Sequence, residues 1–129
     1  MPGPIPAEVI RVIDGDTIEV RARIWVDQEV LTSVRLEGVD TPEIRGPECE
    51  AERIAAEAAS AYVRALALDR VSLRDVQWGT YAGRVVARIE LPDGSDLTER
   101  LLAAYLGVPY GEEHDWCAVA AAQSADGRD

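Results

Sequence analysis

Alternation of apolar and polar residues predicts β-strands over much of the chain. Between residues 17 and 26 the apolar side chains fall at every second position, and charged residues such as Glu19 and Arg21 occupy the other face. Alternation or β-branched runs predict four further strands, at residues 7–13, 30–39, 71–76 and 84–91. Only short turns separate the first three strands, among them Asp14-Gly15-Asp16, so these strands form a meander.

Helical spacing follows the third strand. Apolar residues three and four positions apart predict a helix with one face on the core, formed by Ala51, Ile54, Ala58, Ala61, Ala65 and Leu68. Pro47 suits the first turn of this helix, and the acidic residues that follow suit its positive end. A second helix is predicted at residues 96–106, with Gly107 as its stop, and a short third one around residues 116–123.

The order of these elements, three strands, a helix, two strands and a helix, predicts the fold class. A five-stranded barrel with a helix between strands three and four is the arrangement of an OB-fold. We therefore predict an α+β, mainly β domain with two to three helices; a generic α+β sandwich is the alternative. The length fits one domain, residues 1–129, with flexible ends at residues 1–6 and 124–129. We interpret Trp25, Trp78 and Trp116 as packing residues rather than as base-stacking ones.

Charge restricts which partners the protein can bind. All 13 basic residues are Arg, against 24 Asp and Glu, which gives a net charge of -11. Since an acidic surface repels phosphate, any chemistry on nucleic acid must use a local cluster of Arg. The chain has one histidine, His114, so acid–base chemistry must otherwise come from carboxylates and Arg.

The sequence shows neither a membrane span nor a signal peptide. No run of residues is apolar for long enough to cross a bilayer, so we expect no membrane association. The first residues lack the basic and apolar regions of a signal peptide. Two cases stay open: a cytoplasmic protein, or a secreted or periplasmic one whose signal peptide has been trimmed. We expect a monomer.

Acidic residues lie where predicted strands end. Asp16 follows the first turn, and Asp40 and Glu43 follow the third strand. If neighbouring strands bring Asp16 and Asp40 to one rim, their carboxylates repel each other unless a cation lies between them. Oxygen ligands favour Ca²⁺ or Mg²⁺ over zinc. Glu43 would then orient or deprotonate a water molecule. Taken singly, these residues also suit an ordinary turn and a helix entry.

Two arginines are candidates for the same rim. Arg35 lies on the third strand and Arg84 opens the fifth. With a metal and a base, these cations complete what phosphoryl transfer needs, because they stabilise charge on the equatorial oxygens. Each arginine alone is more often a residue of a strand surface.

Three segments together resemble the signature segments of the staphylococcal (micrococcal) nuclease, or thermonuclease, family. They are residues 13–17, 34–43 and 81–84; they occur in the family's order, and the first predicted helix falls between the second and the third. The third segment carries an extra residue, Ala82, between Tyr81 and Gly83. The similarity covers about residues 7–117, and it implies an OB-fold barrel with nuclease activity.

The resemblance implies a Ca²⁺ site and a base. Asp16 and Asp40 would bind Ca²⁺ through their carboxylates, and Thr41 would bind it through its backbone carbonyl. Glu43 would be the general base, or would orient the attacking water.

The resemblance also implies residues that bind substrate. Arg35 and Arg84 would bind the scissile phosphate and stabilise the transition state, and Tyr81 and Tyr110 would lie near the nucleotide. The expected substrates are single-stranded or frayed DNA and RNA, cut at the P–O5′ bond to leave a 3′-phosphate.

The two cysteines, Cys49 and Cys117, match no zinc-site spacing. A disulfide between them would fasten the loop after Glu43 to the C-terminal segment and would imply an oxidising compartment. Two free thiols are the alternative.

Two classes of function follow from these observations. The first is an enzyme, a Ca²⁺-dependent phosphodiesterase that acts as an endonuclease. The second is a catalytically inactive OB-fold module that binds nucleic acid or a protein partner. Such a module is expected to have lost at least one of the residues that carry the chemistry, which are Asp16, Arg35, Asp40, Glu43 and Arg84. Since all of them are present, we favour the enzyme.

Overall fold

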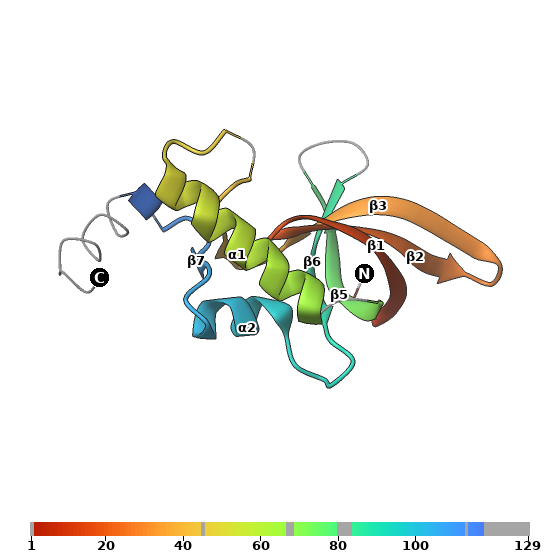
Figure 1. The fold of residues 1–129 in the computed structure, drawn as a ribbon. Helices are drawn as coiled ribbons and strands as arrows, with labels where there is room; N and C mark the ends of the chain where they lie inside the picture. The colour runs from red at the N-terminus through yellow and green to blue at the C-terminus, as the bar shows by residue number, and fades with distance from the viewer. Residues whose placement is uncertain (1, 45, 67–68, 80–83, 113, 118–129) are drawn as a thin grey trace.

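A closed five-stranded barrel forms the body of the protein. The computed structural model describes residues 2–44, 46–66, 69–79, 84–112 and 114–117. The barrel strands are β1 (Ile5–Asp14), β2 (Thr17–Trp25), β3 (Gln28–Leu36), β5 (Arg70–Trp78) and β6 (Arg84–Glu90), in the order β1-β2-β3-β6-β5. Neighbouring strands are antiparallel, apart from the parallel pair β3 and β6. The predicted fold class, a mainly β, OB-fold-like barrel with helices, is confirmed (Figure 1).

Two helices and a two-stranded sheet accompany the barrel within the described residues. α1 (Glu50–Leu66) connects β4 (Val39–Asp40) to β5 and packs against β1, and α2 (Leu97–Ala103) contacts β6 and β4. β4 pairs with β7 (Val108–Pro109) in an antiparallel ladder. Figure 1 shows both helices at one end of the barrel and the β2–β3 hairpin projecting beyond the other. None of the helices described here is long and apolar enough to cross a membrane.

The core is built from the inward residues of the alternating strands and from one face of each helix. Its members come from all five barrel strands, and those at most 2% exposed include Ile18, Leu36, Leu73, Ile89 and Leu101. Each such side chain contributes about 1.5–3 kcal/mol by leaving water. The period-2 pattern therefore predicts the inward face correctly within the barrel.

The β2–β3 hairpin leaves apolar side chains in water. Ile24 is 45% exposed and Trp25 is 70% exposed. The reason is that β6 pairs with β3 only from Ser33 onward, so the tip of the hairpin pairs with itself alone. Trp78, at the end of β5, is 88% exposed. The interpretation of Trp25 and Trp78 as packing residues is therefore wrong.

Two predicted boundaries differ from the structure, and two other predictions lie mostly or wholly outside the described residues. β1 takes in part of the predicted flexible end, because Ile5 is buried and pairs with Leu73. The predicted third strand stops at Leu36, after which a turn through Gly38, with φ +89°, leads into β4. Most of the short helix predicted at 116–123 lies outside the described residues, as does the predicted flexible end at 124–129.

α1 buries a different face from the predicted one. Its buried residues are Ala56, Ala59, Ser60 and Val63. The predicted face is exposed at Ile54, Ala58, Ala61 and Ala65, and Leu68 lies outside the described residues. Since alanine occurs on every side of this helix, spacing alone does not distinguish the two faces.

α2 ends before the predicted stop. The N–H of Leu106 donates to the carbonyl of Leu101 at 3.1 Å, and Tyr105 has φ +60°, which together form a Schellman motif. Gly107 has another role, because a Cβ atom there would lie 2.6 Å from Val39 Cγ2. Glycine at this position lets the chain pass closely over β4.

Candidate functional site

Asp16 is a buried carboxylate at the turn between β1 and β2, where it is 7% exposed. Its Oδ2 accepts the backbone N–H of Thr41 at 3.0 Å and pairs with Arg35 Nη1 at 3.2 Å. Its Oδ1 accepts the hydroxyl of Thr17 at 3.0 Å. Both oxygens therefore have partners, as a buried charge requires.

Gly15 lets this turn lie close to α1 and to the segment after β4. A Cβ atom at position 15 would lie 2.8 Å from Ala59 Cβ and 2.9 Å from Thr41 Oγ1. We expect Gly15→Ala to displace Asp16 from Thr41 and to lower the free energy of unfolding by about 1–3 kcal/mol. Urea unfolding measures this loss. A change below roughly 0.5 kcal/mol would mean that α1 and the Thr41 segment move apart at almost no cost.

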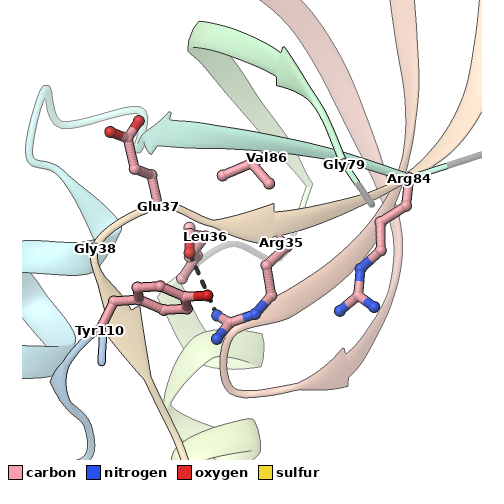
Figure 2. A pocket seen from close by; sticks show the side chains of 8 residues that line it. All are labelled: Arg35, Leu36, Glu37, Gly38, Gly79, Arg84, Val86 and Tyr110. Atoms are coloured by element: carbon pink, nitrogen blue, oxygen red, sulfur yellow. Dashed lines mark hydrogen bonds between the residues drawn. The ribbon is translucent and has the colours of Figure 1, made fainter. Parts of the chain in front are cut away.

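Arg35 links the two aspartates. From β3 its Nη1 pairs with Asp16 and its Nη2 pairs with Asp40 Oδ1. Nη1 also donates to the carbonyl of Leu36 at 3.3 Å (Figure 2) and to the carbonyl of Val39 at 2.8 Å. The side chain is 18% exposed. One guanidinium group therefore joins the Asp16 turn, β3 and β4.

Asp40 is the more accessible of the two carboxylates. Its side chain is 38% exposed, against 10% for that of Asp16. Its Oδ2 accepts the backbone N–H of Gly111 at 3.3 Å. The structure thus brings Asp16 and Asp40 to one rim, where both contact the guanidinium of Arg35.

Arg84 lies beside this cluster at the start of β6. In the parallel pairing of β3 and β6 it is level with Ser33, two residues before Arg35. Its Nη2 donates one long hydrogen bond, 3.4 Å, to the hydroxyl of Thr17. Figure 2 shows the guanidinium groups of Arg35 and Arg84 extending to the same side of the sheet. Two positively charged side chains from neighbouring strands therefore lie on the same side of the sheet.

The two arginines line a hollow of about 310 Å³. Its other lining residues are Leu36, Glu37, Gly38, Gly79, Val86 and Tyr110 (Figure 2). Tyr110 is 71% exposed, and the centroid of its ring lies 5.7 Å from Arg35 Cζ, which is within the range of a cation–π contact. Tyr81, the other predicted substrate-binding residue, lies outside the described residues.

Glu43 lies on the loop after β4 and is exposed. Its loop is fixed by Asp14, whose Oδ1 accepts the backbone N–H of Ile44 at 3.2 Å. In the part of the chain that the structure describes, Glu43 forms no hydrogen bond or ion pair with Asp16 or Asp40. Glu43 is therefore close to Asp40 in sequence, but in the structure its side chain contacts neither Asp16 nor Asp40.

Asp16 and Asp40 are the residues that could hold a metal ion. Their oxygen donors suit Ca²⁺ in kind, and two negative charges meet one guanidinium charge at this rim. Among the described residues, no group of three or more His, Cys, Asp and Glu side chains is arranged to hold a metal. Because Ca²⁺ takes roughly six to eight oxygens, backbone carbonyls, water and substrate would have to complete its shell.

Thr41 follows Asp40 in the chain, and its backbone N–H donates to Asp16. It is 6% exposed, and its Oγ1 is buried without a hydrogen-bond partner. An unsatisfied buried hydroxyl is uncommon, since it costs about 1–3 kcal/mol. The residue whose backbone carbonyl the resemblance assigns to the metal therefore also carries a buried hydroxyl without a hydrogen-bond partner.

Several residues that support the site were not predicted from the sequence. The hydroxyl of Thr17 connects Asp16 to Arg84, and Asp14 holds the loop of Glu43. Both belong to the segment at residues 13–17, which marks them as neighbours of Asp16. The contact of Gly111 with Asp40 spans 71 positions and has no sequence signal.

Comparison with known proteins adds no relative: no family model matches the chain, and no curated protein matches it.

Proposed function

We propose that the protein is a Ca²⁺-dependent nuclease of the staphylococcal nuclease type, which hydrolyses phosphodiester bonds in single-stranded or frayed DNA and RNA. The observation that carries this proposal is the convergence of Asp16, Asp40 and Arg35 on one rim, with Arg84 beside them on β6. Carboxylates for a cation and guanidinium groups for a phosphate are the parts that phosphoryl transfer needs.

The two arginines would have different tasks. Arg84 makes one long hydrogen bond within the described part of the chain, so its guanidinium can turn to a phosphate at little cost. Arg35 is held by two carboxylates and two carbonyls, so it would fix the position of Asp16 and Asp40 as well as contribute charge to the phosphate. Bound Ca²⁺ would supply positive charge to a phosphate oxygen and would acidify a water molecule.

Glu43 would take the proton of the attacking water. Its side chain is exposed and its loop is anchored at Ile44, so its carboxylate would have to turn towards the rim to act on a water molecule there. Attack of this water on phosphorus would break the P–O5′ bond, the departing O5′ oxygen would take a proton from solvent, and the products would be a 3′-phosphate and a 5′-hydroxyl.

The acidic surface sets the conditions under which this activity would appear. The net charge of -11 repels nucleic acid at long range, and that repulsion weakens with salt. The positive charge of Arg35 and Arg84 would act only over short distances in the hollow. We therefore infer that substrates bind weakly and that binding depends on Ca²⁺.

The test is hydrolysis of a fluorogenic single-stranded DNA by wild type and Glu43→Gln, each with Ca²⁺ and with a chelator. We expect cleavage by wild type in Ca²⁺ alone, and a rate about 10²-fold lower in Glu43→Gln with Ca²⁺ binding retained. Glu48→Gln is the matched control, because it removes the same charge from another exposed residue before α1. Unchanged turnover in Glu43→Gln would remove Glu43 from the mechanism.

A binding module that does not cut is the second candidate. It is favoured by an apolar groove of about 540 Å³ at the end of the barrel, whose lining includes Ile24, Val30 and Trp78. Absence of cleavage by folded wild type in Ca²⁺ would favour this module over the nuclease.

A further inference from the structure

The C-terminal strap, defined as residues 108–112 and 114–117, begins against the proposed site. In β7, Val108 pairs with Asp40 and Pro109 pairs with Val39. Beyond β7 the N–H of Tyr110 donates to the carbonyl of Gly38 at 3.1 Å. Its neighbour Gly111 donates its N–H to Asp40 Oδ2, and the ring of Tyr110 lies against Arg35. This end of the strap thus contacts two of the residues that carry the proposed chemistry.

The other end of the strap is covalently joined to α1. Cys117 forms a disulfide with Cys49, 68 positions earlier, with a Cα–Cα distance of 6.2 Å. Cys49 directly precedes α1: its carbonyl accepts the N–H of Arg53 at 3.1 Å, and its Sγ accepts the N–H of Glu52 at 3.3 Å. The disulfide therefore ties the strap to the start of the helix whose Ala59 lies beside the Asp16 turn.

Little apolar burial holds the strap between its ends. Every described residue of the strap is exposed or half-buried, and none belongs to the buried core. Its contacts include ones within the strap itself, such as the N–H of Cys117 on Asp115 and the ring of His114 on Trp116. The two-residue ladder between β4 and β7 is weak on its own. We therefore expect the disulfide to contribute much of what keeps the strap in place.

We propose that the Cys49–Cys117 disulfide is a redox switch for the proposed site. Reduction frees the far end of the strap, and the contacts of Gly111 with Asp40 and of Tyr110 with Arg35 loosen. The control of activity by this disulfide rests on the proposed function. The control of the position of the strap does not. The disulfide lowers the entropy that the strap loses on docking, and reduction removes that advantage.

The redox step balances with a dithiol as reductant. One reductant thiolate attacks Sγ of Cys117 or Cys49 and forms a mixed disulfide, while the other protein sulfur leaves as a thiolate and takes a proton. The second reductant thiol then releases the remaining cysteine and closes the oxidised reductant. The protein gains two electrons and two protons, and the dithiol loses them.

Amide ¹⁵N order parameters test the movement without relying on activity. In oxidised wild type we expect values of about 0.85 for Tyr110 and Gly111, as in the barrel at Leu36. After dithiothreitol the values for Tyr110 and Gly111 should fall below about 0.6, while that of Leu36 stays unchanged. Values that stay high at Tyr110 and Gly111 in the reduced protein would overturn the proposal.

Two variants separate loss of the disulfide from other effects of the reductant. Cys117→Ser leaves the α1 start intact, and Cys49→Ser keeps an oxygen acceptor for Glu52. Both should resemble reduced wild type and should not respond to dithiothreitol. If either variant fails to fold, chemical reduction of wild type, checked by circular dichroism, still decides the question.

Hydrolysis of single-stranded DNA in Ca²⁺ adds the functional readout. We expect at least a 10-fold lower rate in reduced wild type, restored on reoxidation. Loosened amides with an unchanged rate would overturn the switch. Absence of hydrolysis in both redox states would overturn the proposed nuclease and with it the control of activity, whereas the order parameters would still decide the control of the strap.

Discussion

Replacing Arg84 by alanine is expected to lower kcat for single-stranded DNA about 10³-fold with almost no loss of stability. The catalytic part of this expectation follows from position, because Arg84 faces the same hollow as Arg35 from the neighbouring strand. The stability part follows from its contacts, since among the described residues the Arg84 side chain makes one hydrogen bond, 3.4 Å long, to Thr17, and alanine removes it. Steady-state kinetics in Ca²⁺ and thermal unfolding measure the two quantities.

Arg88→Ala is the matched control for Arg84→Ala. Arg88 lies on the same strand but forms an ion pair with Asp96 at 3.0 Å, and it is not one of the residues that line the hollow. Its replacement should leave kcat unchanged. Arg84→Lys keeps the charge and loses the fork of donors, so it should recover only part of the rate. A loss confined to KM in Arg84→Ala would assign this residue to ground-state binding.

The barrel could be predicted because the physical causes of strands are local. A period-2 pattern fixes the inward face of a strand such as β2, and Ile18 and Val20 are indeed buried. The order of strands and helix then allows few topologies. The pattern cannot tell where a strand leaves the barrel, so Ile24 continues the alternation and is still exposed.

The helices were less predictable because two kinds of signal are ambiguous. In α1, alanine on all sides makes the apolar spacing fit more than one face, and only tertiary packing selects Ala59 and its neighbours. In α2, glycine is the usual residue with positive φ after a helix, yet here Tyr105 takes that conformation. Gly107 is required for close packing on Val39, which is a contact between distant segments.

The candidate site, too, could be predicted only in part from the sequence. Strand ends place Asp16, Asp40 and Arg35 near one rim, and that much follows from the sequence and from the family resemblance. That Arg35 contacts both carboxylates depends on side-chain rotamers and on the position of β4. The contacts of Gly111 and the strap depend on loop geometry and on the disulfide, and these leave no periodic signal.

Arg35→Met is expected to lower the free energy of unfolding by about 3 kcal/mol, because it removes the shared partner of two carboxylates, one of them buried. For a domain of this size the loss corresponds to about 10 °C in Tm. The double variant Arg35→Met/Asp16→Asn should recover part of it, since a neutral amide no longer repels Asp40. Equal losses in the single and double variants would assign the effect to the lost hydrogen bonds with Val39 and Leu36.

The same variant tests whether the two carboxylates bind a cation. Without Arg35, Asp16 and Asp40 repel each other, so Ca²⁺ should stabilise Arg35→Met more than wild type. At a free Ca²⁺ concentration 100 times Kd the gain would be about 2.7 kcal/mol. Mg²⁺ should give less, since it requires a stricter octahedral shell. The measurement is Tm of both proteins against Ca²⁺ concentration. An unchanged Tm in Arg35→Met would mean that Asp16 and Asp40 are held apart from any Ca²⁺, and the proposed nuclease would lose its metal site.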